Sequence, residues 1–166
     1  MYRKIVLAFD GSEEGARALR EGALLAKACG AKVILLSVVP ETGGFVMAEG
    51  IQAGVMAKMI EDRKALLERG VARLRQLGCE AVARLEVGEP APVIGAVARE
   101  VKADVVMVGH RKQSLLARWW SGSNNDYLTD HVGCTVVLCR SVISDEVFDA
   151  ALKKAEAERA AAAAAG

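Results

Sequence analysis

Short apolar runs alternate along the chain with longer segments in which apolar residues recur every three or four positions. The runs Ile5–Phe9 and Val33–Val39 are apolar almost throughout, which is typical of strands covered on both faces. Between them, Ser12 can cap a helix that ends at about Cys29, with Gly30 as its stop signal. The chain therefore opens with a buried strand, a helix and a second buried strand.

The alternation continues to about residue 140. Glycines at positions 43, 44, 50 and 54 predict a loop that could act as a lid, and a helix is expected from about Val55 to Leu77. The later predicted elements are an edge strand at about Glu80–Val87, a helix from Pro90, a strand at Asp104–Val108, a short helix to about His131 and a strand at Thr135–Arg140. Strands that alternate with helices predict an open, twisted parallel sheet with helices on both faces.

Length and composition favour one domain. A chain of 166 residues with 52% hydrophobic content can bury one core, which we assign to residues 1–141. Residues 142–166 are predicted to form a helical or disordered tail, because Ala160–Ala165 offers no large side chain to bury and should fray. A net charge of +1 argues against nucleic-acid and membrane partners, and no apolar run reaches the length of a membrane span. We expect a cytoplasmic protein.

Ligands of open parallel sheets bind beyond the carboxyl ends of the strands, so the loops there are the place to look for a site. Asp10, Gly11 and Ser12 directly follow the first strand. The Asp10 carboxylate could accept hydrogen bonds from ribose hydroxyls or an adenine amino group. The alternative is that Asp10 only ends a strand ahead of a helix cap.

The loop after the fourth strand is the second candidate. Its predicted ligand-binding residues are Gly109, His110, Arg111, Lys112, Gly122, Ser123 and Asn124. Backbone N–H groups at the start of the following short helix, together with hydroxyl, amide and basic side chains, could hold an anion. The alternative is an ordinary solvated loop.

This spacing resembles a known signature. The pattern Gly109-x-x-Lys112-x9-Gly122-Ser123 is similar to the Gly-x-x-Gly-x9-Gly-Ser/Thr nucleotide-binding signature of the universal stress protein family, and the resemblance extends over roughly residues 3–140. It implies a Rossmann-like, five-stranded parallel sheet in the order 3-2-1-4-5. It also implies a homodimer formed through strand Thr135–Cys139.

The resemblance further implies how a nucleotide would be held. The residue matching Asp10 and the backbone near Val38 and Val39 would bind adenine and ribose. Residues matching Gly109, Gly122 and Ser123 would bind ribose and phosphates. The expected cofactor is ATP or another adenine nucleotide, with Mg or Mn on its phosphates.

One residue departs from the signature, because Lys112 stands where the family has its second glycine. Glycine there permits positive φ and close approach of phosphate. Lys112 could instead contact phosphate through its ammonium group, or it could close the pocket. Two hypotheses follow: a stress-response protein with adenine nucleotide as a regulatory ligand, and a nucleotide-free dimeric interaction module.

Enzymatic activity is not expected beyond slow ATP hydrolysis. The chain has no Gly-x-Ser-x-Gly, Gly-x4-Gly-Lys-Ser/Thr or Gly-x-Gly-x-x-Gly motif, and no catalytic residue is assigned. His110 and His131 lack metal-ligand spacing, so no protein metal site is expected either. The adjacent Trp119 and Trp120 could offer one side chain to a protein partner.

Overall fold

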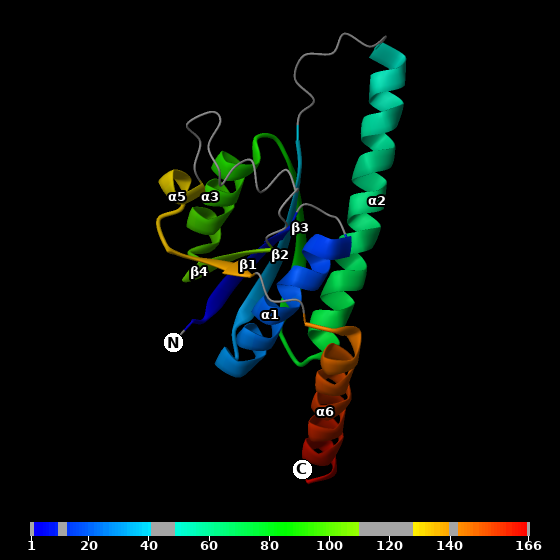
Figure 1. The fold of residues 1–166 in the computed structure, drawn as a ribbon, viewed down its shortest axis with the longest axis vertical. Helices are drawn as coiled ribbons and strands as arrows, with labels where there is room; N and C mark the ends of the chain where they lie inside the picture. The colour runs from blue at the N-terminus through cyan, green and yellow to red at the C-terminus, as the bar shows by residue number, and fades with distance from the viewer. Residues whose placement is uncertain (1, 10–12, 41–48, 110–127, 140–142, 166) are drawn as a thin grey trace.

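The computed structural model describes residues 2–9, 13–40, 49–109, 128–139 and 143–165. Five parallel strands form one sheet in the order β3-β2-β1-β4-β5 (Figure 1). The strands are β1 (Lys4–Phe9), β2 (Lys32–Val39), β3 (Ala81–Val87), β4 (Val105–Gly109) and β5 (Thr135–Cys139). The order and the parallel direction confirm the predicted architecture, with β3 at one edge.

Helices cover both faces of the sheet. They are α1 (Glu13–Cys29), α2 (Glu49–Gln76), α3 (Pro90–Val101), α5 (Leu128–His131) and α6 (Asp145–Ala164). Residues of α1, α2 and α6 pack in one buried cluster, and residues of α3 and α5 pack in another. The sheet is therefore the middle of three layers.

Successive residues of the central strands supply these two clusters in turn. Ile5 and Leu7 of β1 belong to the cluster under α1 and α2, whereas Val6 and Ala8 belong to the cluster under α3. Side chains alternate between the faces of a strand, so burial of both faces requires apolar residues at every position. This is the physical reason for the unbroken apolar run that predicts β1.

The predicted loop after the second strand is shorter than expected. Helix α2 begins at Glu49, so Gly50 and Gly54 are helical and the predicted start near Val55 is wrong. Each glycine costs a helix only about 1 kcal/mol relative to alanine, which a 28-residue helix anchored by a packed C-terminal half tolerates. Residues 41–48, the rest of the predicted lid, lie outside the described part of the chain.

The C-terminal tail contains a long helix. Ser144 caps α6, because its Oγ accepts a hydrogen bond from the Val147 backbone nitrogen at 3.4 Å. The helix buries Phe148 and Ala155, and it extends through Ala164, across most of the stretch for which fraying is expected. The division between residues 1–141 and 142–166 as domain and tail stays a prediction.

Helix α6 lies along both α1 and α2. Lys27 of α1 pairs with Glu158 at 3.0 Å, and Arg159 donates to the backbone oxygen of Gln76 in α2 at 2.7 Å. Figure 1 shows the first part of α6, orange, beside the last turns of α2, with the red part continuing past the end of α2. None of the helices in the described ranges is both long enough and apolar enough to cross a membrane.

Candidate functional site

The carboxyl ends of all five strands meet at one edge of the sheet because the strands are parallel. At this edge β1 lies between β2 and β4: Phe9 is the register partner of Ser37, and Ala8 is the partner of Val108. The chain leaves β1 towards β2 on one side, whereas β4 is followed by β5 on the other. The switch in direction lies between β1 and β4, which is where open α/β sheets hold ligands.

Three predicted site residues are within the described structure. Val38 and Val39 are the penultimate and last residues of β2, and both are buried, with 5% and 0% of their surface exposed. The Val39 carbonyl oxygen accepts a hydrogen bond from the Gly88 nitrogen at 3.0 Å. Gly109 ends β4 beside Cys139 of β5. The predicted ligand contacts on β2 and β4 thus lie at the same sheet edge, on either side of the end of β1.

The other predicted residues lie outside the described part of the chain. These are Asp10, Gly11, Ser12, His110, Arg111, Lys112, Gly122, Ser123 and Asn124, together with Trp119 and Trp120. The described strands nevertheless bound the segments that contain them. Residues 10–12 follow the end of β1, and residues 110–127 follow the end of β4.

Two helices begin at this edge of the sheet, and both have acidic residues where they begin, Glu13 and Glu14 in α1 and the N-cap residue Glu89 of α3. Helix α1 begins at Glu13, shortly after β1, and α3 begins with Pro90 at its first position, shortly after β3. The N-terminal end of a helix carries partial positive charge, which favours anions. Glu86, the register partner of Val38, lies 2.7 Å from the Arg84 guanidinium, which also pairs with Glu100, so one positive charge serves two carboxylates there. The partial positive charge of the two helix ends favours an anion at this edge, whereas the acidic residues there oppose one.

Ser37 is a polar residue at this edge that the sequence reasoning did not assign to the site. Its side chain is fully buried, and its Oγ has no hydrogen-bond partner among the described residues. An unsatisfied buried hydroxyl costs roughly 1–3 kcal/mol. The sequence signal is available, since Ser37 is the one polar position in the run Val33–Val39.

Comparison with known proteins identifies relatives over most of the chain. The sequence profile of the universal stress protein family matches residues 1–140. A Staphylococcus epidermidis relative, whose name also assigns it to universal stress proteins, is 28% identical over 149 residues, which cover 89% of each chain.

Two solved structures of relatives contain adenine nucleotides. A universal stress protein in complex with cAMP is 26% identical and superposes with a TM-score of 0.57, covering 82% of this chain and 95% of its own. The universal stress protein from Archaeoglobus fulgidus in complex with dAMP is 25% identical, with a TM-score of 0.56 and coverage of 84% and 98%.

Proposed function

The chain belongs to the universal stress protein family, and we propose that it binds an adenine nucleotide at the carboxyl edge of the sheet, between β1 and β4. The nucleotide acts as a regulatory ligand of a cytoplasmic stress-response protein. ATP is the form we propose, and occupancy alters the protein's conformation or its partners.

The observation that carries the proposal is the register of the central strands. Ala8 pairs with Val108, so the segments that follow β1 and β4 leave the sheet from neighbouring positions. Residues 10–12 and 109–124 contain the carboxylate, glycines and hydroxyls that suit a ribose and phosphates. Relatives in complex with cAMP and dAMP support the choice of an adenine nucleotide.

Each predicted site residue is proposed to contact the part of the nucleotide that its chemistry suits. Asp10 accepts hydrogen bonds from ribose or adenine, and the backbone at Val38 and Val39 contacts the base. Gly109, Gly122 and Ser123 receive the ribose and phosphates, and Mg or Mn binds the phosphate oxygens. Lys112 supplies an ammonium group to the phosphates in place of the family's second glycine.

Strand β5 is the basis of a second proposal, a homodimer. It is the edge strand beside β4, and Thr135–Cys139 presents backbone groups that a second strand can pair with. We propose that two copies of the chain pair through these strands.

Calorimetric titration with ATP and Mg tests the nucleotide site. We expect saturable binding by the wild type, loss of binding in Asp10→Ala, and retention in the matched control Asp62→Ala, whose exposed carboxylate lies on α2. Absence of binding at millimolar ATP in the wild type would contradict the proposal and favour the nucleotide-free interaction module.

A second pair of variants tests the role of Lys112. Lys112→Gly weakens binding if the ammonium group contacts phosphate and tightens binding if the side chain obstructs the pocket. Lys102→Gly is the control, because Lys102 is exposed at the opposite end of the sheet and has a positive φ of 53° that glycine adopts readily. Unchanged affinity in Lys112→Gly would remove Lys112 from the site.

A further inference from the structure

A separate cleft lies on the face of the sheet, between α1, α2 and the first turn of α6. Its volume is about 610 Å³, and Leu7 and Leu35 form its floor. These leucines occupy the middle of β1 and β2, so the cleft is distinct from the carboxyl edge where the nucleotide site is proposed. The volume is within the range of small-molecule sites, roughly 300–1,000 Å³.

The walls of the cleft combine apolar and cationic side chains. Leu19, Leu66 and Leu74 continue the apolar floor. Four arginines line the same cleft: Arg17 and Arg20 from α1, and Arg69 and Arg73 from α2. Asp145 is the one carboxylate among the described lining residues.

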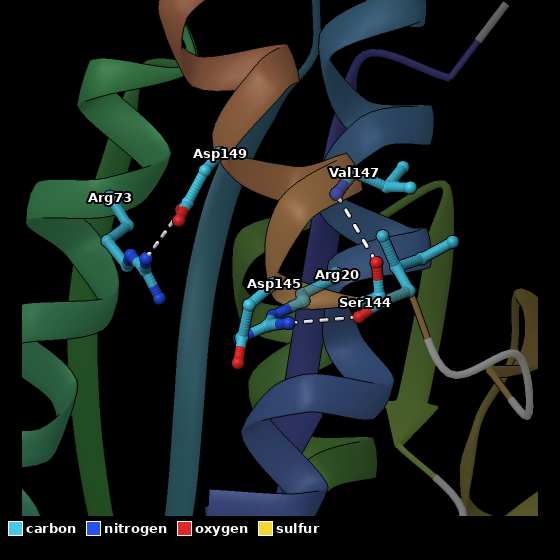
Figure 2. A network of polar contacts seen from close by, with 7 residues as sticks. Arg20, Arg73, Ser144, Asp145, Val147 and Asp149 are labelled. Atoms are coloured by element: carbon cyan, nitrogen blue, oxygen red, sulfur yellow. Dashed lines mark hydrogen bonds and ion pairs between the residues drawn. The ribbon is translucent and has the colours of Figure 1, made fainter.

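Two of these arginines anchor α6 and close one end of the cleft. Arg20, with 8% of its surface exposed, donates to the Asp145 carboxylate and to the Ile143 carbonyl oxygen. Arg73 donates to Asp149 at 3.0 Å. Their guanidinium carbons lie 5.3 and 5.6 Å from the centre of the Phe148 ring. Figure 2 shows these arginines and aspartates around the start of α6.

The other two arginines are available to a ligand. Arg17 and Arg69 are exposed, and neither forms an ion pair with those residues whose side chains the structure describes, although Arg17 lies near enough to Asp145 to help lower the pKa of that carboxyl. Asp145 and Asp149 are matched by Arg20 and Arg73, so Arg17 and Arg69 leave the cleft with excess positive charge. They stand on different helices, so one anionic group between them could be contacted from both walls.

We propose that this cleft binds a small amphipathic anion, an aliphatic chain with a carboxylate or phosphate head. The chain lies on the apolar floor between α1 and α2, and the head lies between Arg17 and Arg69. The apolar lining of the cleft favours an aliphatic chain over a purely hydrophilic anion, and its guanidinium groups favour an anion over a neutral lipid. Helix α6 lies beyond residues 1–140, which match the family, so one end of this cleft is built from the chain's own C-terminal helix.

Titration calorimetry with defined probes tests the proposal on the full-length protein. Dodecanoate and dodecyl phosphate represent the two head groups, and dodecyltrimethylammonium has the same chain with the opposite charge. We expect saturable binding of at least one anionic probe and at least about tenfold weaker binding of the cation. Whichever anion binds more tightly identifies the head group. Failure of both anions to bind, or equal binding of the cation, would overturn the proposal.

Paired variants locate the binding. The double variant Arg17→Gln/Arg69→Gln should bind the anionic probe more weakly, by about tenfold or more, because two charge-assisted contacts are lost. Lys58→Gln/Lys64→Gln removes the same charge from exposed positions of α2 outside the cleft and should leave affinity unchanged. Equal losses in the two double variants would indicate a nonspecific charge effect and overturn the site.

A steric variant tests the apolar part independently. Ala72 is exposed on α2 and lines the cleft, so Ala72→Trp should block the chain of the probe. Ala57→Trp, at an exposed position of α2 away from the cleft, is the control. Thermal melting of all variants verifies that they fold. Undiminished binding in a folded Ala72→Trp variant would contradict the proposed location.

Discussion

The two faces of the sheet are closed in different ways. On one face α3 and α5 meet at their backbones: a Cβ at Gly95 would lie 2.3 Å from the carbonyl oxygen of His131. On the other face α1 and α2 leave a groove between them, and α6 fills only part of it. Both faces rest on largely apolar residues of the central strands β1, β2 and β4, so the difference lies in the helices.

The side chains that the helices present differ between the two faces, and this affects how closely the helices pack. Gly95 of α3 allows the backbone of α5 to approach closely. Four arginines of α1 and α2 line the groove on the other face, where charged groups need solvent or a partner. Helix α6 supplies that partner at one end through Phe148, Asp145 and Asp149.

The largest expected effect concerns the anchor of α6. Phe148→Ala should destabilise the protein by about 3–5 kcal/mol, because a buried ring between two guanidinium groups is replaced by a cavity. Urea unfolding followed by circular dichroism measures this loss. The neighbouring Val147→Ala, at a side chain that is 55% exposed, should change stability by less than about 0.5 kcal/mol. Similar values for the two variants would show that α6 is not part of the cooperative core.

A smaller effect on stability is expected on the face of the sheet that α3 and α5 cover. Gly95→Ala should cost about 1–3 kcal/mol, because the new methyl group collides with the backbone of His131 and α5 must shift. The same substitution at Gly54, where no atom lies within 4 Å of the added Cβ, should stabilise the helix by about 0.5–1 kcal/mol. Urea unfolding of both variants gives the comparison. A stabilising Gly95→Ala would refute the close approach of α3 and α5.

The smallest expected effect is a loss of local stability of α6 at low pH. The hydrogen bond from Arg20 holds the pKa of the Asp145 carboxyl below its usual value. A depressed folded-state pKa stabilises the folded protein above the unfolded pKa of about 3.9, and this contribution is lost as the pH falls through the lower folded-state value. We therefore expect α6 to lose protection from amide hydrogen exchange below about pH 4, before α3 does.

The Asp145→Asn variant provides the control for this pH dependence. Its α6 should be less protected than the wild type at pH 6 and should change less on acidification, because the titrating group is gone. Hydrogen exchange followed by NMR resolves the two helices. Parallel loss of protection in α3 and α6 of the wild type would contradict a local role for the Arg20–Asp145 pair.

Much of the secondary structure is predictable because its signals are local. The mainly apolar runs in β1 and β2 and the stop signal at Gly30 need no tertiary information, and Gly30 does adopt a positive φ of 61°. Reliance on local signals also explains why the start of α2 is predicted wrongly. A local rule scores Gly50 and Gly54 as loop residues, whereas the helix they belong to is stabilised by packing further along the chain.

The candidate nucleotide site also has a part that the sequence predicts and a part that depends on the tertiary structure. Its residues are found from spacing in sequence, since Asp10 follows one strand and Gly109 ends another. The adjacency of β1 and β4 is a tertiary fact, and the predicted strand order came from family resemblance rather than from periodicity. Local patterns specify strands, but pairing between strands about 100 residues apart depends on how the helices pack on each face.

The alternation of strands and helices, the two-sided burial of the sheet and the candidate residues of the proposed nucleotide site can all be predicted from the amino-acid sequence, because each prediction depends on neighbouring positions. The placement of the first turn of α6 in the groove between α1 and α2, and of Arg17 and Arg69 along the same groove, is known only from the tertiary structure. Spacing shows that Arg17 and Arg20 share one helix face, and that Arg69 and Arg73 share another. That these two faces line the same cleft depends on the packing of helices far apart in sequence, which no local pattern encodes.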